Sequence, residues 1–313
     1  MSLTTTVRRL IPQRWINALR QRTWPWRISR QISPYLPPVV CVDVGASYYP
    51  HVKWLTFLNG PRTQWLAVEP NEVNLGYVKS WSWPSQVHTC TVGLSQEGGE
   101  QTLFVTHVDS GSSLLPPEIP VAMQHRITNL DYFFPVTERR IQTLTLIQAM
   151  QHLSNTAPVF VKLDTQGTEL SILQGAQALF NAQRIVGIEM ESTMLAQPFM
   201  KGSGKFWQAC QYLEAQGFEL LHVKPIHAPR QSGRSKPVAN TFLNECDAIF
   251  ALRPDIAQQL PVEFRASLLG FYLTNSFFEE ALSLLQRDTG VSAFLRDQGC
   301  QLEALVQDIS TII

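Results

Sequence analysis

The chain has 313 residues, of which 44% are hydrophobic and 16% charged, and its formal net charge at pH 7 is zero. Such a composition is typical of a globular protein with a large buried core. Without a basic excess the chain lacks the electrostatic surface that binds nucleic acid, so we expect no nucleic-acid partner. The five cysteines are odd in number and far apart, which argues against a disulfide framework and a CxxC zinc site.

The sequence pattern contains no targeting or membrane signal. No run reaches the roughly 18 apolar residues that a membrane-spanning helix needs. The first residues are charged but lack the apolar core of a signal peptide. We therefore expect a cytoplasmic protein whose thiols stay reduced.

Residues 1–37 form a basic segment with seven arginines and no acidic residue. Ile16, Leu19 and the tryptophans of this segment are spaced to form one apolar stripe of a helix. Two interpretations are open. The helix lies on the domain with its arginines in solvent, or it makes a peripheral contact with a membrane surface or a partner.

From residue 38 to residue 254, strand-like runs alternate with helical patterns, which predicts a parallel sheet covered by helices. The apolar runs that predict buried strands are 39–45, 65–71, 87–95, 159–164 and 184–191. The segments with helical spacing are 51–60, 168–182 and 205–217. Between the third and fourth strands, residues 100–108 predict an inserted strand, and residues 141–150 predict a strand that leads into a short helix.

Two further strand patterns, 218–226 and 245–253, follow one another without a helix between them, so they predict an antiparallel pair on the sheet. Residues 255–313 show helical spacing. We expect this C-terminal helical extension to act as a lid or as an oligomer contact, for example in a homodimer. The predicted organisation is thus a basic segment (1–37), a central domain (38–254) and a helical extension (255–313).

The first predicted strand ends in the sequence DVGAS, residues 43–47. A glycine directly after a buried strand lets a ligand approach the backbone at the carboxyl edge of a sheet. Tyr48 and Tyr49 fill the positions at which a dinucleotide fingerprint has glycines, so NAD and flavin dinucleotides are disfavoured. The motif favours a ligand without phosphates.

The second predicted strand ends in AVEPN, with Glu69 at its tip. An acidic side chain at this place accepts hydrogen bonds from both hydroxyls of a ribose. Together with the glycine turn after the first strand, Glu69 predicts a nucleoside site. S-Adenosylmethionine (SAM) carries a ribose diol and a positively charged sulfonium but no phosphate, so it fits both motifs.

The order of these motifs resembles the FkbM-type methyltransferases, a branch of the class I SAM-dependent enzymes. The resemblance covers residues 38–253. Its most specific part is VFVKLDTQGTELSILQGA, residues 159–176, which is similar to that family's Lys-x-Asp-x-Glu-Gly-x-Glu followed by a helix. The resemblance implies a class I (Rossmann-like) α/β fold with a seven-stranded, mostly parallel sheet and an antiparallel last strand, here with an added N-terminal helix and C-terminal helical extension. It also implies methyl transfer to oxygen, typically on sugars or secondary metabolites.

The cofactor site expected from the motifs and the resemblance consists of Asp43, Gly45, Ala46, Ser47, Glu69, Pro70, Asn71, Ser95 and Asp164. Within it, the resemblance puts Asp43 near the methionine moiety and Ser95 near the adenine. Two positions depart from the family's pattern. The first loop lacks a second glycine, and Gln166 replaces a glutamate, which removes a carboxylate that would otherwise serve catalysis or a metal.

Asp164 ends the fourth predicted strand, which in this architecture faces the methyl group. Methylating an alcohol requires removal of its proton while the sulfonium is attacked in line, so Asp164 is predicted to be the base or to position the acceptor. Lys162 alternates onto the same face and is expected to hold the charge of Asp164, with a purely structural ion pair as the alternative. His107 and His125, in the inserted segment, are further candidate bases, with solvated loop histidines as the alternative.

Glu189 and Glu191 share one face at the end of the fifth predicted strand. Together with Asp164 they offer hard oxygen ligands for a divalent cation, an alternative that the pattern permits but does not favour. Glu169 is expected in the first turn of the next helix, where an acidic side chain suits the helix dipole.

The sequence therefore predicts a SAM-dependent O-methyltransferase that acts on a hydroxyl of a small molecule, either a secondary metabolite or a saccharide. Two other classes stay open: a methyltransferase-like binding protein without activity, and a different Rossmann-type enzyme that uses NAD. The acceptor is not encoded in a readable motif, and we expect residues 101–140 and 255–313 to shape its pocket.

Overall fold

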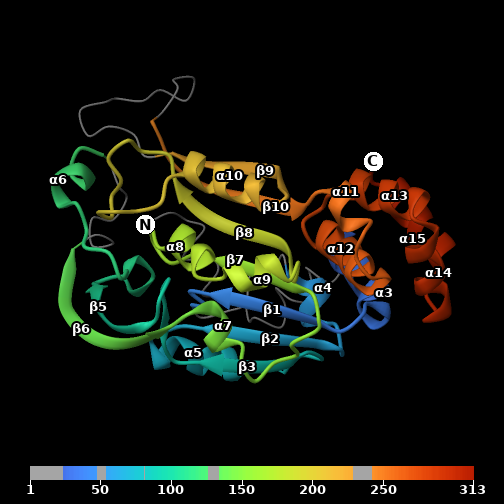
Figure 1. Cartoon of the computed structure of the whole chain (residues 1–313), viewed down its shortest axis with the longest axis horizontal. Coiled ribbons are helices and arrows are strands. Elements are labelled where there is room, and N and C mark those ends of the chain that lie inside the picture. The colour runs from blue at the N-terminus through green and yellow to red at the C-terminus, as the bar shows by residue number, and fades with distance from the viewer. Residues whose placement is uncertain (1–23, 48–53, 81, 126–133, 228–241) are drawn as a thin grey trace, which may run out of the picture.

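A seven-stranded sheet forms the centre of the computed structural model, which describes residues 24–47, 54–80, 82–125, 134–227 and 242–313 (Figure 1). Its strands, in spatial order, are β3 (Gln86–Cys90), β2 (Thr63–Val68), β1 (Val39–Val44), β7 (Val159–Leu163), β8 (Ile185–Thr193), β10 (Leu243–Leu252) and β9 (Phe218–His227). β10 runs antiparallel to both of its neighbours, and the other adjacent strands are parallel. This arrangement confirms the expected class I methyltransferase fold.

The central strands are the ones whose sequences are apolar on both faces. Every residue of β1 is buried, and β7 and β8 are buried except for one residue each. Strands covered by helices on both sides need such continuous apolar runs, which explains why sequence alone locates them. β9 alternates between half-buried and exposed residues, as expected of an edge strand.

The helices lie before, between and after the strands. Their bounds are α3 Trp24–Ile32, α4 Leu55–Leu58, α5 Glu72–Lys79, α6 Ile119–Ala122, α7 Leu146–Ala149, α8 Glu169–Gln174, α9 Gln177–Asn181, α10 Phe206–Ala215, α11 Pro254–Ala257, α12 Val262–Thr274, α13 Phe278–Arg287, α14 Thr289–Asp297 and α15 Leu302–Ser310. The predicted helix 168–182 is two helices, α8 and α9. Gly175 separates them where the chain packs so closely on the backbone of Gln96 that a Cβ atom would overlap it.

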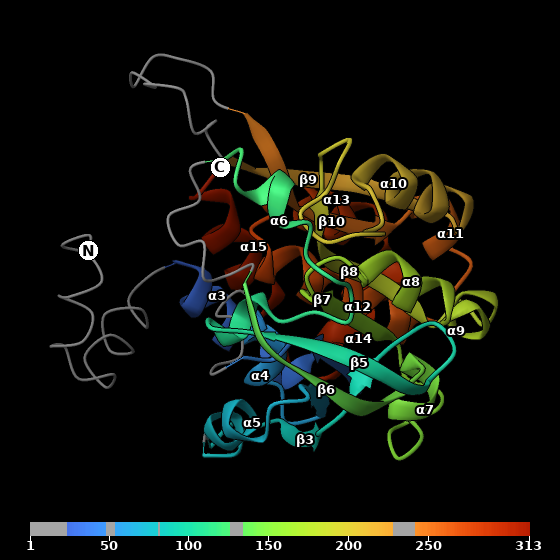
Figure 2. The ribbon, with the colours of Figure 1, turned by 90° about the vertical axis from the view of Figure 1, so that its left-hand side faces the viewer.

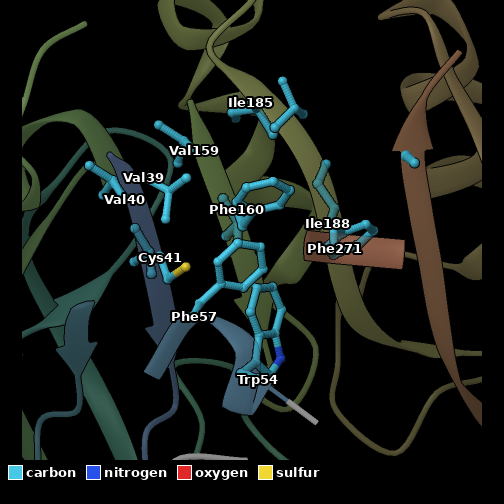
Figure 3. Packing of buried hydrophobic residues seen from close by; sticks show 14 of the residues in the cluster. Val39, Val40, Cys41, Trp54, Phe57, Val159, Phe160, Ile185, Ile188 and Phe271 are labelled. Atoms are coloured by element: carbon cyan, nitrogen blue, oxygen red, sulfur yellow. The ribbon is translucent and has the colours of Figure 1, made fainter. Parts of the chain in front are cut away.

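A cluster of aromatic rings joins the C-terminal helices to the sheet (Figure 3). Phe160 of β7 stacks on Phe57 of α4, with ring centroids 4.7 Å apart, and on Phe271 of α12, at 5.2 Å. The indole Nε1 of Trp54 donates a hydrogen bond to Glu189 at 3.1 Å. Residues 266–274 of α12 are all buried. Helix α12 thus belongs to the same core as the sheet, whereas the lid and dimer roles of residues 255–313 stay predictions.

The N-terminal helix α3 packs on the domain through fully buried Ile28 and Ile32. Its exposed Arg27 pairs with Asp308 of α15 at 2.7 Å. Residues 1–23, which carry most of the arginines of the predicted basic segment, lie outside the described residues, so a membrane or partner contact stays a prediction. Within the described ranges no helix combines the length and apolar character needed to cross a membrane.

A second, three-stranded sheet is inserted between β3 and β7. It consists of β4 (Gly93–Leu94), β6 (Pro135–Leu144) and β5 (Gly99–Thr106), in that order. Predicting one strand over 87–95 was therefore wrong. The chain leaves the large sheet after Cys90, because Gly93 and Leu94 pair with Thr143 and Leu144 of β6 instead. Figure 2 shows the long β5–β6 ribbon crossing in front of the large sheet.

Candidate active site

A cavity of about 150 Å³ opens at the carboxyl ends of β1, β2 and β7. Six residues predicted for the cofactor site line it: Gly45, Ser47, Glu69, Pro70, Asn71 and Asp164. The opposite wall belongs to the insertion, where Leu103, Val105 and Ile141 of the β5–β6 ribbon face the cavity. The cavity therefore lies between the edge of the sheet and the ribbon, at the place where open α/β sheets bind ligands.

Gly45 allows β1 and β7 to end side by side. Its φ is +77°, a left-handed conformation that favours glycine. Its amide donates to the carbonyl of Val68, while the amide of Asp164 donates to the carbonyl of Val44. A Cβ atom at residue 45 would overlap the carbonyl oxygen of Asp164. The glycine thus brings the first loop into contact with the residue that we predict to be catalytic.

Ser47 presents an unused polar group to the same cavity. Its hydroxyl is buried and has no hydrogen-bond partner among the described residues. A buried hydroxyl without a partner is costly, and a polar ligand relieves that cost. This is the behaviour expected of a residue that contacts the polar part of a cofactor.

Glu69 is held at the tip of β2 by the turn that follows it. Its Oε1 accepts a hydrogen bond from the amide of Asn71 at 2.9 Å, and the Asn71 side chain in turn accepts from Val73 and caps α5. Burial raises the pKa of Glu69 to about 7, although the bond from Asn71 lowers it, and the charge of Asp109 adds to the rise. A partner that donates hydrogen bonds to this carboxylate would offset its desolvation.

Lys162 joins two of the predicted acidic residues. Its Nζ lies 3.1 Å from Oδ1 of Asp43 and 3.6 Å from Oδ2 of Asp164. Burial disfavours the charge of Lys162, but the carboxylates of Asp43 and Asp164 outweigh this and raise its pKa. Lys162 therefore stays protonated and serves as a counter-charge. Asp43 is buried, and neither Asp43 nor Lys162 lines the cavity.

Gln166 holds Asp164 from the other side. Its Nε2 donates to Oδ1 of Asp164 at 3.3 Å and to Oε2 of Glu191 at 2.8 Å. Burial raises the pKa of Glu191 well above its ordinary value, and the charge of Asp164 adds to this. An amide can donate to both carboxyl groups, whereas an ionised glutamate at residue 166 could donate to neither. Gln166 therefore bridges Asp164 and Glu191 through two hydrogen bonds.

The loop after Asp164 is fixed by Glu169, the first residue of α8. Its Oε1 accepts hydrogen bonds from the amide of Thr165 at 2.7 Å and from the amide of Gly167 at 3.1 Å. Burial raises the pKa of Glu169, and these backbone bonds oppose the rise. Gln166 is held at a φ of +57°, which is uncommon for a residue other than glycine. The carboxylate of Glu169 therefore fixes the conformation of the loop after Asp164 through these hydrogen bonds.

The model of the Methyltransferase FkbM domain matches residues 43–220. The chain belongs to the FkbM methyltransferase family. The family and the fold are those of SAM-dependent methyltransferases, so the cofactor implied for this FkbM protein is SAM. The partnerless Ser47 hydroxyl and the half-buried Glu69 carboxylate, beside the glycine turn, fit a polar nucleoside ligand of this kind.

Three solved structures with a similar fold are distant from this FkbM protein in sequence. A precorrin-6y C5,15-methyltransferase from Geobacter metallireducens has 13% identity and a TM-score of 0.35, and covers 72% of this chain and 87% of its own. A SAM-dependent methyltransferase from Anabaena variabilis has 12% identity and a TM-score of 0.31, and the match covers 77% of this chain and 93% of that chain. A SAM-dependent methyltransferase from Mesorhizobium loti has 10% identity and a TM-score of 0.30, and the match covers 74% of this chain and 99% of that chain. No curated protein matches the sequence.

Several predicted residues of the FkbM site lie outside the cavity lining. Ala46 is buried, and Ser95 uses its hydroxyl to bond Thr143 at 2.8 Å and to accept from the amide of Gly98 at 3.0 Å. His107 is exposed and His125 is packed between Phe199 and Phe242, neither of them against the cavity. Val92, Gly93 and Leu94 line this part of the cavity instead of Ser95.

The alternative metal site at Asp164, Glu189 and Glu191 does not form a cluster. Glu189 accepts its hydrogen bond from Trp54, and Gln166 lies between the other two carboxylates. Within the described parts of the FkbM chain, no group of three or more histidine, cysteine or acidic residues is arranged to hold a metal ion.

Other lining residues of the FkbM cavity were not predicted individually. Ser113 donates from Oγ to the carbonyl of Gln166 at 2.9 Å and ties the insertion to the loop after Asp164. Arg139 also lines the cavity, and its side chain forms no ion pair among the described residues. Leu103 and Val105 are two residues apart in a strand and so lie on one face. This spacing could have predicted the apolar wall of the cavity.

Proposed function

We propose that this FkbM protein transfers a methyl group from SAM to a hydroxyl oxygen of a small molecule, either a secondary metabolite or a saccharide. The observation that supports this most directly is that Glu69 and Asp164 line one cavity with the Gly45 loop between them. A group that binds a nucleoside and a group that accepts a proton then face the same space.

In this proposal the cofactor is held by the tips of β1 and β2. Glu69 accepts from the ribose hydroxyls, because its carboxylate offers free lone pairs beside the one that Asn71 uses. Gly45 and Ser47 bind the amino-acid part, and the apolar Val92 and Leu94 contact the adenine. When bound, SAM supplies a methyl group on a positively charged sulfur.

Asp164 would take the proton of the acceptor hydroxyl while the oxygen–methyl bond forms and the methyl–sulfur bond breaks, with S-adenosylhomocysteine as the leaving group. Lys162 and Gln166 fix the two carboxylate oxygens in place through contacts at 3.6 and 3.3 Å. Because Lys162 stays protonated, it positions Asp164 and does not act as a base. A fixed carboxylate near the sulfur also favours a cationic cofactor over its neutral product.

The direct test is isothermal titration of the protein with SAM and with S-adenosylhomocysteine, and NAD serves as the rival ligand. We expect both adenosyl ligands to bind and NAD not to bind. Replacing Glu69 by alanine should weaken binding of both by about 1–3 kcal/mol, or roughly 5- to 150-fold, because the ribose hydroxyls lose a charged acceptor. Unchanged affinity would remove Glu69 from the site, and tighter binding of NAD would reverse the choice of cofactor.

The affinity for a nucleoside should also depend on pH through Glu69. Because burial raises its pKa to about 7, about one tenth of the protein carries the ionised carboxylate at pH 6. Ribose hydroxyls bond the ionised form better, so binding should strengthen about tenfold from pH 6 to pH 8. 5′-Methylthioadenosine is the suitable ligand, because it has no amine or carboxylate of its own to titrate. In Glu69→Gln the affinity should not change between pH 6 and pH 8. If the affinity of this variant depended on pH as strongly as that of the wild type, a group other than Glu69 would be responsible.

A further inference from the structure

A second cavity, of about 260 Å³, lies at the opposite end of the sheet from the cofactor cavity. It is bounded by the start of β9 and by helices α11, α12 and α13. Figure 1 shows these helices at the right-hand end of the sheet, whereas the β5–β6 ribbon, which walls the cofactor cavity, lies at the left. Methyl transfer uses nothing in this second cavity.

The largely buried Tyr272 of α12 lines this cavity. The residue is 5% exposed, and its hydroxyl has no hydrogen-bond partner among the described residues. Glu219 and Glu280 line the same cavity as Tyr272. Burial raises the pKa of Tyr272, and the charges of these two glutamates raise it further. A hydroxyl that has no protein partner and borders a cavity is available to bond a ligand there.

The acidic residues of this cavity are not neutralised by its basic residues. Glu219 and Glu280 form no salt bridge or hydrogen bond through their side chains with any described residue. Arg265 is occupied by Asp288, with Nε and Oδ2 2.6 Å apart. Arg287 is exposed at the rim. Burial raises the pKa of Glu219, Arg253 opposes the rise, and the charges of Asp255 and Glu280 add to it.

We propose that this cavity binds a small organic primary ammonium ion. An –NH3⁺ group has three donors, and the cavity offers three acceptors in Glu219, Glu280 and the hydroxyl oxygen of Tyr272. The aromatic ring of Tyr272 adds attraction for a cation. Leu268 and Leu284 form an apolar wall that suits a hydrocarbon body.

The test is isothermal titration of the full chain with n-hexylammonium chloride, with 1-hexanol as the neutral probe of similar shape. We expect saturable binding of the ammonium ion and at least about tenfold weaker binding of the alcohol, because only the ion makes charge-assisted hydrogen bonds. Tyr272→Phe and the double variant Glu219→Gln/Glu280→Gln should each weaken ammonium binding about tenfold or more. Equal affinity for the two probes, or full affinity in the double variant, would overturn the proposal.

Two control variants separate this site from other effects. Glu263→Gln removes an exposed carboxylate of α12 that does not line the cavity, so ammonium binding should stay unchanged. Asp164→Asn alters the cofactor cavity, and ammonium binding should persist in it. Loss of binding in Asp164→Asn would place the ion at the sheet's other end and refute the assignment. Thermal unfolding followed by circular dichroism checks that each variant is folded.

Discussion

Replacing Asp164 by asparagine is expected to lower methyl transfer by about 10²- to 10⁴-fold, the range typical of a lost general base. The side chain is 46% exposed at the cavity, and it is held by Lys162 and Gln166 rather than buried in the core. The protein should therefore fold normally. Turnover is measured as S-adenosylhomocysteine released with a hydroxylated acceptor that the wild type methylates.

The same substitution gives a result that needs no acceptor. The sulfonium of SAM is positively charged, whereas the sulfur of S-adenosylhomocysteine is neutral. Loss of the Asp164 carboxylate should therefore weaken binding of SAM more than binding of the product. An equal loss of affinity for SAM and S-adenosylhomocysteine would mean that Asp164 contacts a part of the cofactor other than the sulfonium.

Asp247→Asn is the matched control for Asp164. Asp247 belongs to β10 of the large sheet and does not line the cavity, and its partner is Lys224 at 3.0 Å. An exposed pair of this kind contributes little to stability. Turnover and the preference for SAM over its product should both stay near the wild-type values. If Asp247→Asn lowered turnover and the preference for SAM as much as Asp164→Asn does, these losses would reflect the overall charge of this edge of the sheet and not one catalytic group.

The parts of the site that sequence could predict are those fixed by local rules. A buried strand that ends in a glycine or a carboxylate points to the carboxyl edge of the sheet, and this located Gly45, Glu69 and Asp164 correctly at the cavity. The helical spacing of 168–182 likewise predicted a buried stripe, whose members Ile172 and Leu173 are fully buried. Each of these inferences needs only neighbouring residues.

The parts that sequence could not predict depend on pairing between distant residues. The position of Ser95 follows from the register of β4 on β6, and residues 94 and 144 that meet there are 50 apart in the chain. The two contacts of Gln166 join the tips of β7 and β8, which no periodicity reveals. The core position of α12 had a local signal, because residues 268–273 (LLGFYL) are a run without charged residues instead of a single apolar stripe.

Gly45→Ala is expected to damage the site and the fold together. A Cβ atom there overlaps the carbonyl oxygen of Asp164, which belongs to the backbone and cannot rotate away. The φ of +77° adds strain for any residue with a side chain. Relief requires the tips of β1 and β7 to separate. We expect the free energy of unfolding to fall by about 2–4 kcal/mol in urea titrations.

Separation of those two tips must also change the ligand cavity, because Gly45 and Asp164 both line it. We therefore expect the affinity for SAM to fall by about 100-fold or more, since small displacements in a preorganised site are costly. Gly76→Ala is the control: Gly76 lies within α5, and nothing is within 4 Å of an added Cβ atom. That change should stabilise the protein by up to about 1 kcal/mol and leave the affinity unchanged. A Gly45→Ala protein that binds SAM normally would show that the first loop does not hold the cofactor, whatever its effect on stability.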